Sequence, residues 1–287
     1  MVASIEYIEQ VIDTYGRATE ANLRTPTRQG NVIVLTADDA DEVMITGDLH
    51  GHRPNFNAIR RTADLDQNPR RHLIMQEVCH GGPSYPTNGG CMSHAMLEDV
   101  AKLKATHPDR LHFVLSNHEL AELTDYPILK SQKMLNLFFR YGLQEMYGPA
   151  TEKVRQAYLA FLRSSPLAVR LPGGVLFTHS LPEQLDQRPF DQSVFDRELE
   201  VADLREGGAV FDLLWGRDYR QENADGFAQL MGARTLIHGH DPCPDGYKVP
   251  NTTQIILDCC GRPAAYVIVP IDESVTHDAI VERIKTL

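Results

Sequence analysis

Apolar positions follow helical spacing in some segments of the chain and extended spacing in others. Near the N-terminus, apolar residues from Ile5 to Tyr15 form a stripe that predicts a helix over 4–23, within an N-terminal segment 1–26 that ends at a proline. The same spacing predicts further helices over 54–65, 92–106, 127–163 (interrupted near Gly148-Pro149), 193–206, 223–232 and, at the C-terminus, 275–287.

Strands are predicted where β-branched and other apolar residues run together between turn signals. These runs lie at 31–37, 41–48, 72–75, 111–116, 174–180 and 233–240, followed by TQIILDCC and AAYVIVPI. The acidic ADDAD between the first two runs predicts a hairpin turn, and the last two runs are expected to pair with each other. Because helices and strands alternate without a repeat or a linker, the pattern favours a single layered α/β domain over 1–287, with its core at 31–270.

Composition narrows the class of protein. The 287 residues are 42% hydrophobic and 23% charged, which is typical of a globular chain, and the net charge is −11. A chain this acidic, without a basic stripe, is not expected to bind nucleic acid or an anionic membrane surface. No apolar stretch reaches the ~18 residues of a membrane span, and the first residues do not resemble a signal peptide. Five scattered cysteines indicate reduced thiols, so a cytoplasmic protein is expected.

Five of the predicted strands end in short loops that carry metal-ligating or titratable residues. In chain order these are Asp48 and His50, then Glu77 and His80, then Asn117, His118 and Glu119, then His179, and finally His238 and His240. Open α/β sheets usually build their sites at the carboxyl ends of strands. A lone histidine is more often hydrogen-bonded or exposed than a ligand, but five such loops together favour a site. Oxygen and imidazole donors without thiolate suit Mn, Fe or Zn.

These residues resemble the calcineurin-like metallophosphoesterases, and most of all their phosphoprotein phosphatase (Ser/Thr phosphatase) branch. Gly47-Asp48-Leu49-His50-Gly51 matches the GDxHG motif of that branch, and Ser116-Asn117-His118-Glu119 matches its GNHE motif with serine in place of glycine. Later in the chain, Thr178-His179 follows a strand, Asp212-Leu213-Leu214-Trp215 resembles DLLW, and HDPCPDGY from His240 matches the final histidine and DGY. The resemblance covers about residues 41–260 and implies a layered β-sandwich flanked by helices.

The second motif of that family, GDxVDRG, is altered in this chain. The corresponding residues are Gln76-Glu77-Val78-Cys79-His80-Gly81-Gly82. Glu77 takes the place of the bridging aspartate, His80 replaces an aspartate that supports the catalytic histidine, and Gly81 replaces an arginine that clamps phosphate. An alternative alignment would make His80 the metal ligand; we favour Glu77 because a pair of cations needs a shared anion.

The resemblance implies a dinuclear centre of two divalent metal ions (manganese, iron or zinc). Glu77 would bridge the ions, Asp48 and His50 would hold the first, and Asn117, His179 and His240 the second. A bridging hydroxide would attack phosphorus, and His118 would act as general acid for the leaving oxygen. Glu119, Glu122 or His80 would orient His118. Arg217, with Arg53 and Arg262 as further candidates, would replace the missing arginine, whereas His238 is expected to face away from the metals.

The leading interpretation is therefore a hydrolase: a metallophosphatase acting on phosphomonoesters, with phosphoserine or phosphothreonine in proteins as one substrate class and small phosphorylated molecules as another. A diesterase or dinucleoside-polyphosphate hydrolase is an alternative, because loss of the arginine weakens the preference for monoesters. A second alternative is a non-catalytic module that binds metal or a phosphorylated ligand, and the altered second motif is its support.

Overall fold

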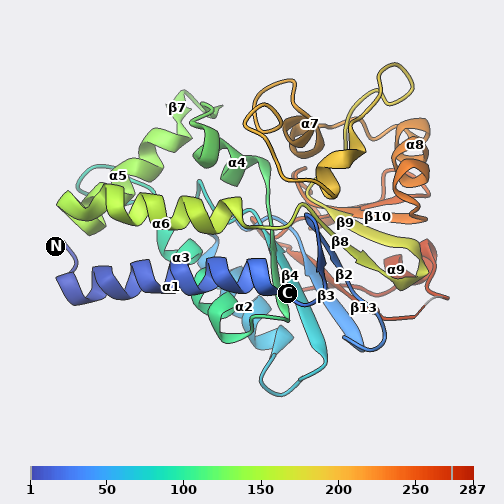
Figure 1. The fold of residues 1–287 in the computed structure, drawn as a ribbon, viewed down its shortest axis with the longest axis horizontal. Coiled ribbons are helices and arrows are strands. Elements are labelled where there is room, and N and C mark those ends of the chain that lie inside the picture. The colour runs from blue at the N-terminus through green and yellow to red at the C-terminus, as the bar shows by residue number, and fades with distance from the viewer. Residues whose placement is uncertain (1, 273) are drawn as a thin grey trace.

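The structure is a computed structural model that describes residues 2–272 and 274–287, and it is built from two β-sheets that lie face to face between layers of helices (Figure 1). The seven-stranded sheet has the order β1 (Arg28–Gln29), β2 (Val32–Val34), β8 (Ala168–Leu171), β9 (Val175–Thr178), β10 (Thr235–His238), β12 (Gln254–Leu257) and β11 (Tyr247–Lys248). The five-stranded sheet has the order β14 (Ile284–Thr286), β13 (Ala265–Pro270), β3 (Glu42–Thr46), β4 (Arg71–Gln76) and β5 (Leu111–Val114).

Helices cover the outer face of each sheet. Those over the five-stranded sheet are α1 (Ile5–Arg24), α2 (Arg53–Ala63), α3 (His94–Thr106), α5 (Leu135–Tyr147) and α6 (Thr151–Arg163). The remaining helices are α4 (Asn117–Thr124), α7 (Ala209–Trp215), α8 (Gln221–Met231) and α9 (His277–Val281), and the 3-10 turns are Gly148–Ala150, Pro172–Gly174 and Gln192–Phe195. Figure 1 shows α1 and α6 lying side by side, and a short hairpin of β6 (Leu129–Lys130) and β7 (Lys133–Met134) projects near α5.

One apolar core lies between the two sheets. Ile33, Phe177 and Ile237 from the larger sheet pack with Val43 and Val267 from the smaller one. On the opposite face of the smaller sheet, helix α1 contributes an apolar stripe, and the Ser4 side chain caps its first turn by accepting a hydrogen bond from the backbone amide of Tyr7. The expected layered β-sandwich flanked by helices is therefore confirmed.

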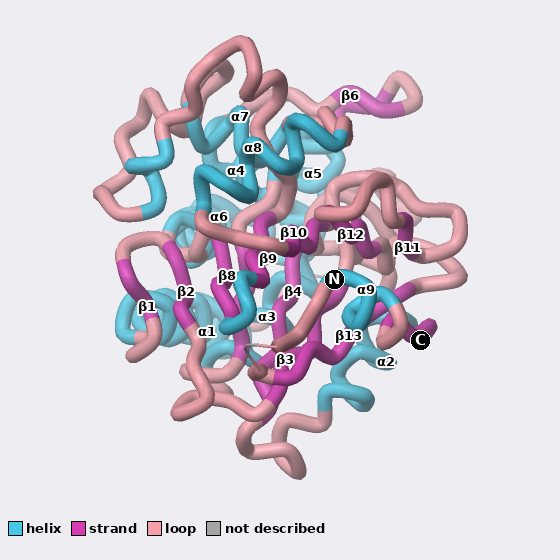
Figure 2. Tube along the Cα trace, turned by 90° about the vertical axis from the view of Figure 1, so that its right-hand side faces the viewer, coloured by secondary structure: helices cyan, strands magenta, loops and turns pink. Residues whose placement is uncertain are grey.

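Two runs of parallel strands place the carboxyl ends of six strands close together. Strands β3, β4 and β5 are parallel neighbours in the smaller sheet, and β9, β10 and β12 are parallel neighbours in the larger one. A bridge between Asp48 and Asp258, just beyond β3 and β12, joins the sheets at this edge. Figure 2 shows the strands of the larger sheet side by side, in the order from β1 to β11. Residues that follow these strands therefore converge, although they are far apart in the sequence.

Both predicted strand pairings are wrong. Strand β2 joins β8 in the larger sheet, whereas β3 joins β4 and β13 in the smaller one, so the acidic segment between β2 and β3 is a crossover and not a hairpin turn. Likewise β12 and β13 lie in different sheets. The reason is that Ile33, Val43 and their neighbours face the core between the sheets, and an apolar pattern specifies burial without specifying the hydrogen-bonded partner.

Three predicted helices are also corrected. The helix expected over 127–163 begins only at Leu135, because the hairpin of β6 and β7 precedes it. The segment 275–287 contains only the short helix α9 before the chain turns into β14, which pairs with β13. In the segment 193–206, helical structure is limited to the turn Gln192–Phe195, because Asp203 accepts hydrogen bonds from the Arg197 guanidinium and from the backbone amide of Glu200 and so fixes a loop. Among the described residues, no helix is both long and apolar enough to cross a bilayer.

Candidate metal centre and active site

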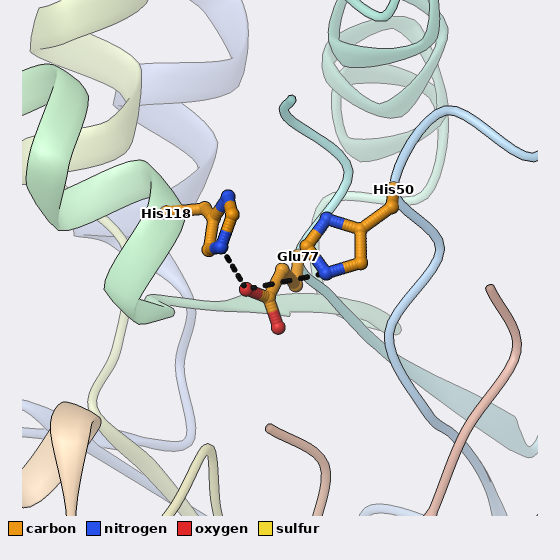
Figure 3. Close-up of side chains that lie close together, drawn as sticks. All are labelled: His50, Glu77 and His118. Carbon is orange, nitrogen blue, oxygen red and sulfur yellow. Dashed lines mark ion pairs between the residues drawn. The ribbon is translucent and has the colours of Figure 1, made fainter. Parts of the chain in front are cut away.

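Two groups of side chains at the shared edge of the sheets could each hold a metal ion. One consists of His50, Glu77 and His118, and the other of Glu77, His179 and His240; within each group the ligand atoms lie within 4.8 Å of one another. Glu77 belongs to both groups. Figure 3 shows the rings of His50 and His118 on either side of its carboxylate, where Oε1 lies 3.7 Å from His50 Nε2 and 3.5 Å from His118 Nε2.

The strand ends supply these residues. Asp48 and His50 follow β3, Glu77 follows β4, and Asn117 begins α4 just after β5. His179 follows β9 and His240 comes two residues after β10, and the Nε2 atom of His179 lies 2.7 Å from Asn117 Oδ1 and 3.1 Å from His240 Nδ1. The structure thus brings together the six predicted metal ligands, and all of them except His50 are buried.

Backbone strain is concentrated in these loops. His50, Glu77, His80 and His240 have positive φ angles of 40°, 44°, 64° and 68°, in the left-handed region that residues other than glycine seldom occupy. Such conformations cost free energy and persist where the surrounding structure enforces them, which is common at functional sites. In this chain they turn the side chains that follow β3, β4 and β10 toward the shared edge.

Hydrogen bonds fix which nitrogen of two histidines faces the centre. The Nδ1 of His179 donates to Gln76 Oε1 over 2.7 Å, and the Nδ1 of His50 donates to the Cys79 carbonyl over 3.1 Å. Each neutral ring then presents an unprotonated Nε2 to the site, which is the form that binds a metal. Gln76 is not among the predicted site residues, although it directly precedes Glu77 and ends a strand whose last five residues are buried.

The site contains buried carboxylates that no positively charged side chain among the described residues neutralises, an arrangement that fits a bound cation. Burial raises the pKa of Asp48 to about 7, and burial together with the neighbouring Asp48 charge raises the pKa of Glu77 well above its ordinary value. Burial also lowers the pKa values of His179 and His240, so the histidines do not neutralise these carboxylates. Asp48 Oδ1, Glu77 Oε2 and His240 Nε2 are buried without a hydrogen-bond partner. Unpartnered carboxylate oxygens beside neutral imidazoles fit divalent metal ions.

His118 lies at the rim of the centre. Its Nε2 faces Glu77, and its Nδ1 lies 2.9 Å from Nδ1 of His80, which in turn contacts Glu122. His80 is in neither metal-binding group, whereas Glu77 is in both. Glu119, also expected near His118, instead accepts hydrogen bonds from the backbone amides of Val78 and Cys79 and holds the turn after β4.

The remaining predicted residues take different positions. Arg217 is about half exposed and forms an ion pair with Asp241 (Nη1 to Oδ1, 2.6 Å). Burial raises the pKa of Glu77, and the Arg217 charge offsets a small part of that rise. Arg53 is paired with Asp99 on α3. His238 is fully buried with its Nδ1 3.1 Å from the Thr178 carbonyl, and it is outside both metal-binding groups.

Comparison with solved structures finds the same fold in several phosphatases. A protein serine/threonine phosphatase from Saccharomyces cerevisiae with similarity to human phosphatase PP5 superposes with a TM-score of 0.71 at 15% identity, over 98% of this chain and 89% of that chain. A cold-active protein-tyrosine phosphatase of a psychrophilic Shewanella species gives a TM-score of 0.59 at 12% identity, over 93% and 84% of the two chains.

Sequence comparison gives the family. No curated protein sequence matches the chain. The model of the calcineurin-like phosphoesterase family, however, matches residues 42–245, the region that holds every candidate ligand described above. Because this match spans most of the chain, the protein belongs to the calcineurin-like phosphoesterases.

Proposed function

We propose that this protein is a phosphomonoesterase that works with two divalent metal ions. Asp48 and His50 would hold one ion, and Asn117, His179 and His240 the other, with Glu77 between them. The observation that carries the proposal is the position of the Glu77 carboxylate: Oε1 lies 3.7 Å from His50 Nε2, and Oε2 lies 3.4 Å from His179 Nε2 and has no hydrogen-bond partner. One carboxylate between two sets of neutral imidazoles is suited to bind two metal ions at once.

When bound, such ions supply positive charge to the phosphoryl oxygens and increase the acidity of the attacking water. The protein's own side chains would do the rest. The Nε2 of His118 faces Glu77 and the centre, so His118 is placed to donate a proton to the leaving oxygen. Arg217, oriented by its ion pair with Asp241, would bind a phosphate oxygen in place of the arginine that Gly81 replaces.

For the substrate, we propose phosphorylated proteins or small phosphomonoesters, both of which present the same dianionic group to the site. The likeness of the fold to a protein serine/threonine phosphatase supports the first class. The altered second motif, with Gly81 at the position of the phosphate-clamping arginine, keeps a diesterase as the alternative activity.

The test is hydrolysis of p-nitrophenyl phosphate and bis(p-nitrophenyl) phosphate by EDTA-treated protein, with and without added Mn²⁺, Fe²⁺ or Zn²⁺. We expect metal-dependent release of phosphate from the monoester, and loss of this activity in His118→Asn, whose metal content should match the wild type. Hydrolysis of the diester alone would replace the proposal with the alternative activity. Metal binding by folded protein without hydrolysis of either substrate would refute an enzymatic role for the centre on these substrates and favour a binding module.

A further inference from the structure

A chain of hydrogen-bonded side chains leads from His118 away from the candidate metal centre. The Nδ1 atoms of His118 and His80 lie 2.9 Å apart, and the Nε2 of His80 lies 2.8 Å from Oε1 of Glu122. The side chains of His80 and Glu122 are fully buried, and the His118 side chain is only 11% exposed. Bulk water therefore has little access to these contacts, and their geometry is set by the protein.

Two further residues fix the far end of this chain. Tyr158 donates its hydroxyl hydrogen to Glu122 Oε2 over 3.0 Å, and the Nδ2 of Asn136 donates to Glu122 Oε1 over 3.1 Å. Both carboxylate oxygens therefore accept from their surroundings, which is the pattern of an ionised carboxylate. Asn136 comes from α5 and Tyr158 from α6, so these two helices hold the side chain of Glu122, a residue of α4, in place.

The direction of each hydrogen bond follows from this arrangement. An ionised Glu122 can only accept, so the hydrogen of a neutral His80 is on Nε2. The Nδ1 of His80 is then an acceptor, and Nδ1 of His118 must be the donor. A neutral His118 ring consequently has its lone pair on Nε2, the atom that faces Glu77 and the centre. A carboxylate two contacts away thus selects one tautomer of the histidine beside the reacting groups.

We propose that Glu122, acting through His80, is a positioning residue for His118 that holds Nε2 as the nitrogen working at the reacting oxygen and supports the ring while it carries an extra proton. This inference rests on the proposed function. In the transfer itself the N–H bond at His118 Nε2 breaks, the O–H bond of the leaving alcohol forms, and the ring returns to the neutral tautomer with its hydrogen on Nδ1. His80 keeps its proton on Nε2 throughout, and Glu122 stays ionised.

Glu122 also links α4 to α5 and α6, so its loss could impair activity through the structure alone. The two roles can be distinguished by the substrates that are affected. A structural defect would slow hydrolysis of every substrate alike. A defect in the acid would slow only substrates with poor leaving groups, since a good leaving group departs without being protonated. The chain contains a matched control: Glu98 is buried, accepts a hydrogen bond from Tyr7 over 2.7 Å and another from Tyr147, and contacts His94, but it belongs to α3 and does not contact His118 or His80.

The first experiment measures kcat and KM of Glu122→Gln for phenyl phosphate and for 2,4-dinitrophenyl phosphate in the metal-loaded protein. We expect kcat for phenyl phosphate to fall by about tenfold or more, kcat for the dinitrophenyl ester to change by less than about threefold, and both KM values to stay near the wild type. His80→Asp in the Glu122→Gln background returns a carboxylate to the side of His118 Nδ1 and should restore part of the loss. Glu98→Gln should affect both substrates equally.

An equal loss for both substrates in Glu122→Gln, or no loss for either, would overturn the inference. If Glu122→Gln does not fold, as judged by circular dichroism and thermal unfolding, His80→Asn serves instead, because asparagine tolerates the positive φ of this position. It should show the same selective loss.

The second experiment reads the tautomers directly and does not depend on activity. In metal-free wild-type protein labelled with ¹⁵N-histidine, with the two rings assigned through His80→Asn and His118→Asn, we expect His80 to carry its hydrogen on Nε2 and His118 on Nδ1. The opposite pattern would overturn the inference even if the enzyme is active. Absence of metal-dependent hydrolysis by the wild type would instead refute the proposed function, while the tautomer result would still stand for or against the arrangement of Glu122, His80 and His118.

Discussion

A Cβ atom at Gly81 would lie 2.2 Å from the carbonyl oxygen of His50, so the loop after β4 touches the loop after β3 at backbone distance. The two loops make a second close contact one residue later, where a Cβ at Gly82 would lie 2.4 Å from the carbonyl oxygen of Gly51. This close approach leaves no room for any side chain at position 81. The arginine that related phosphatases use to clamp phosphate therefore has no space at this position unless the loops separate.

Gly81→Ala should consequently damage the site and not merely add a methyl group. We expect a loss of at least about 1–2 kcal/mol in the free energy of unfolding and at least a tenfold loss of phosphatase activity, because separating the loops displaces His50 from Glu77. Thermal unfolding and the rate with p-nitrophenyl phosphate measure both. Gly261→Ala is the matched control, as a Cβ there meets no atom within 4 Å; equal behaviour of the two variants would contradict the prediction.

Glu77→Ala should abolish activity and lower the metal content of the purified protein by about one ion or more per chain. The reason is that it removes the carboxylate common to both ligand groups and leaves imidazoles facing one another. His80→Ala should retain most of its metal, because His80 contacts His118 and Glu122 and is in neither group. Metal content is measured by inductively coupled plasma mass spectrometry. Normal metal content in Glu77→Ala with depleted His80→Ala would show that the second motif is aligned wrongly.

Gln76→Leu should weaken metal binding about 10- to 100-fold while leaving the protein folded. The substitution removes the carbonyl that accepts from His179 Nδ1, so the ring is no longer held with its unprotonated Nε2 toward Asn117 and His240. Titration of metal-free protein with Mn²⁺ or Zn²⁺ in the presence of a competing chelator gives the affinity. An unchanged affinity would mean that the ring keeps its orientation without Gln76.

Arg217→Ala should raise KM for p-nitrophenyl phosphate by about tenfold with a smaller change in kcat, as expected when a contact to the ground-state phosphate is lost. Arg220→Ala is a close control: both side chains are 47% exposed and both are ion-paired, but Arg220 pairs with Asp186 and Asp218, away from Asp241. If the two variants have the same KM, Arg217 does not bind the substrate.

A pair of buried histidines outside the site should make the fold sensitive to acid. The Nδ1 of His72 on β4 lies 2.9 Å from the Nε2 of His112 on β5, and burial lowers the pKa of His72 to about 4. Between pH 6.5 and 4 the unfolded chain then binds more protons than the folded one, so stability falls as the pH falls. Urea denaturation in the presence of EDTA gives the free energy of unfolding at pH 7.5 and at pH 4.5. The decrease between the two pH values should be about 2 to 3 kcal/mol smaller in His72→Gln than in the wild type. An equal drop in both proteins would mean that His72 titrates normally.

Much of the site could be predicted because its ligands are local features of the sequence. Each predicted ligand lies within a few residues after a run of apolar residues. The ends of parallel strands meet at one edge of a sheet, so Asp48, Glu77 and Asn117 are expected to converge, as they do. The long helix α1 could be predicted for the same reason, because its amphipathic stripe is formed by residues that are close together in the sequence.

The parts that could not be predicted depend on contacts between distant segments. Ile33 and Val43 both read as buried, but nothing in either segment indicates that they belong to opposite sheets. Glu122 follows His118 by one turn of α4, yet its contact with His80 depends on a loop 42 residues earlier in the chain and on a left-handed backbone at that loop. The contacts of Glu119 depend on distant segments in the same way, because the amides it holds belong to the turn after β4.

The bridge between Asp48 and Asp258 marks the line where the two sheets join, and the candidate ligands lie on both sides of it. Asp48, Glu77 and Asn117 come from the smaller sheet, whereas His179 and His240 come from the larger one. Metal ions held by this set would act as crosslinks between the two layers, comparable to a disulfide that closes a very long loop. A chain with only one sheet assembled has only part of the ligand set, so the protein would acquire its metals late in folding, and a loaded centre would identify a molecule that has folded completely.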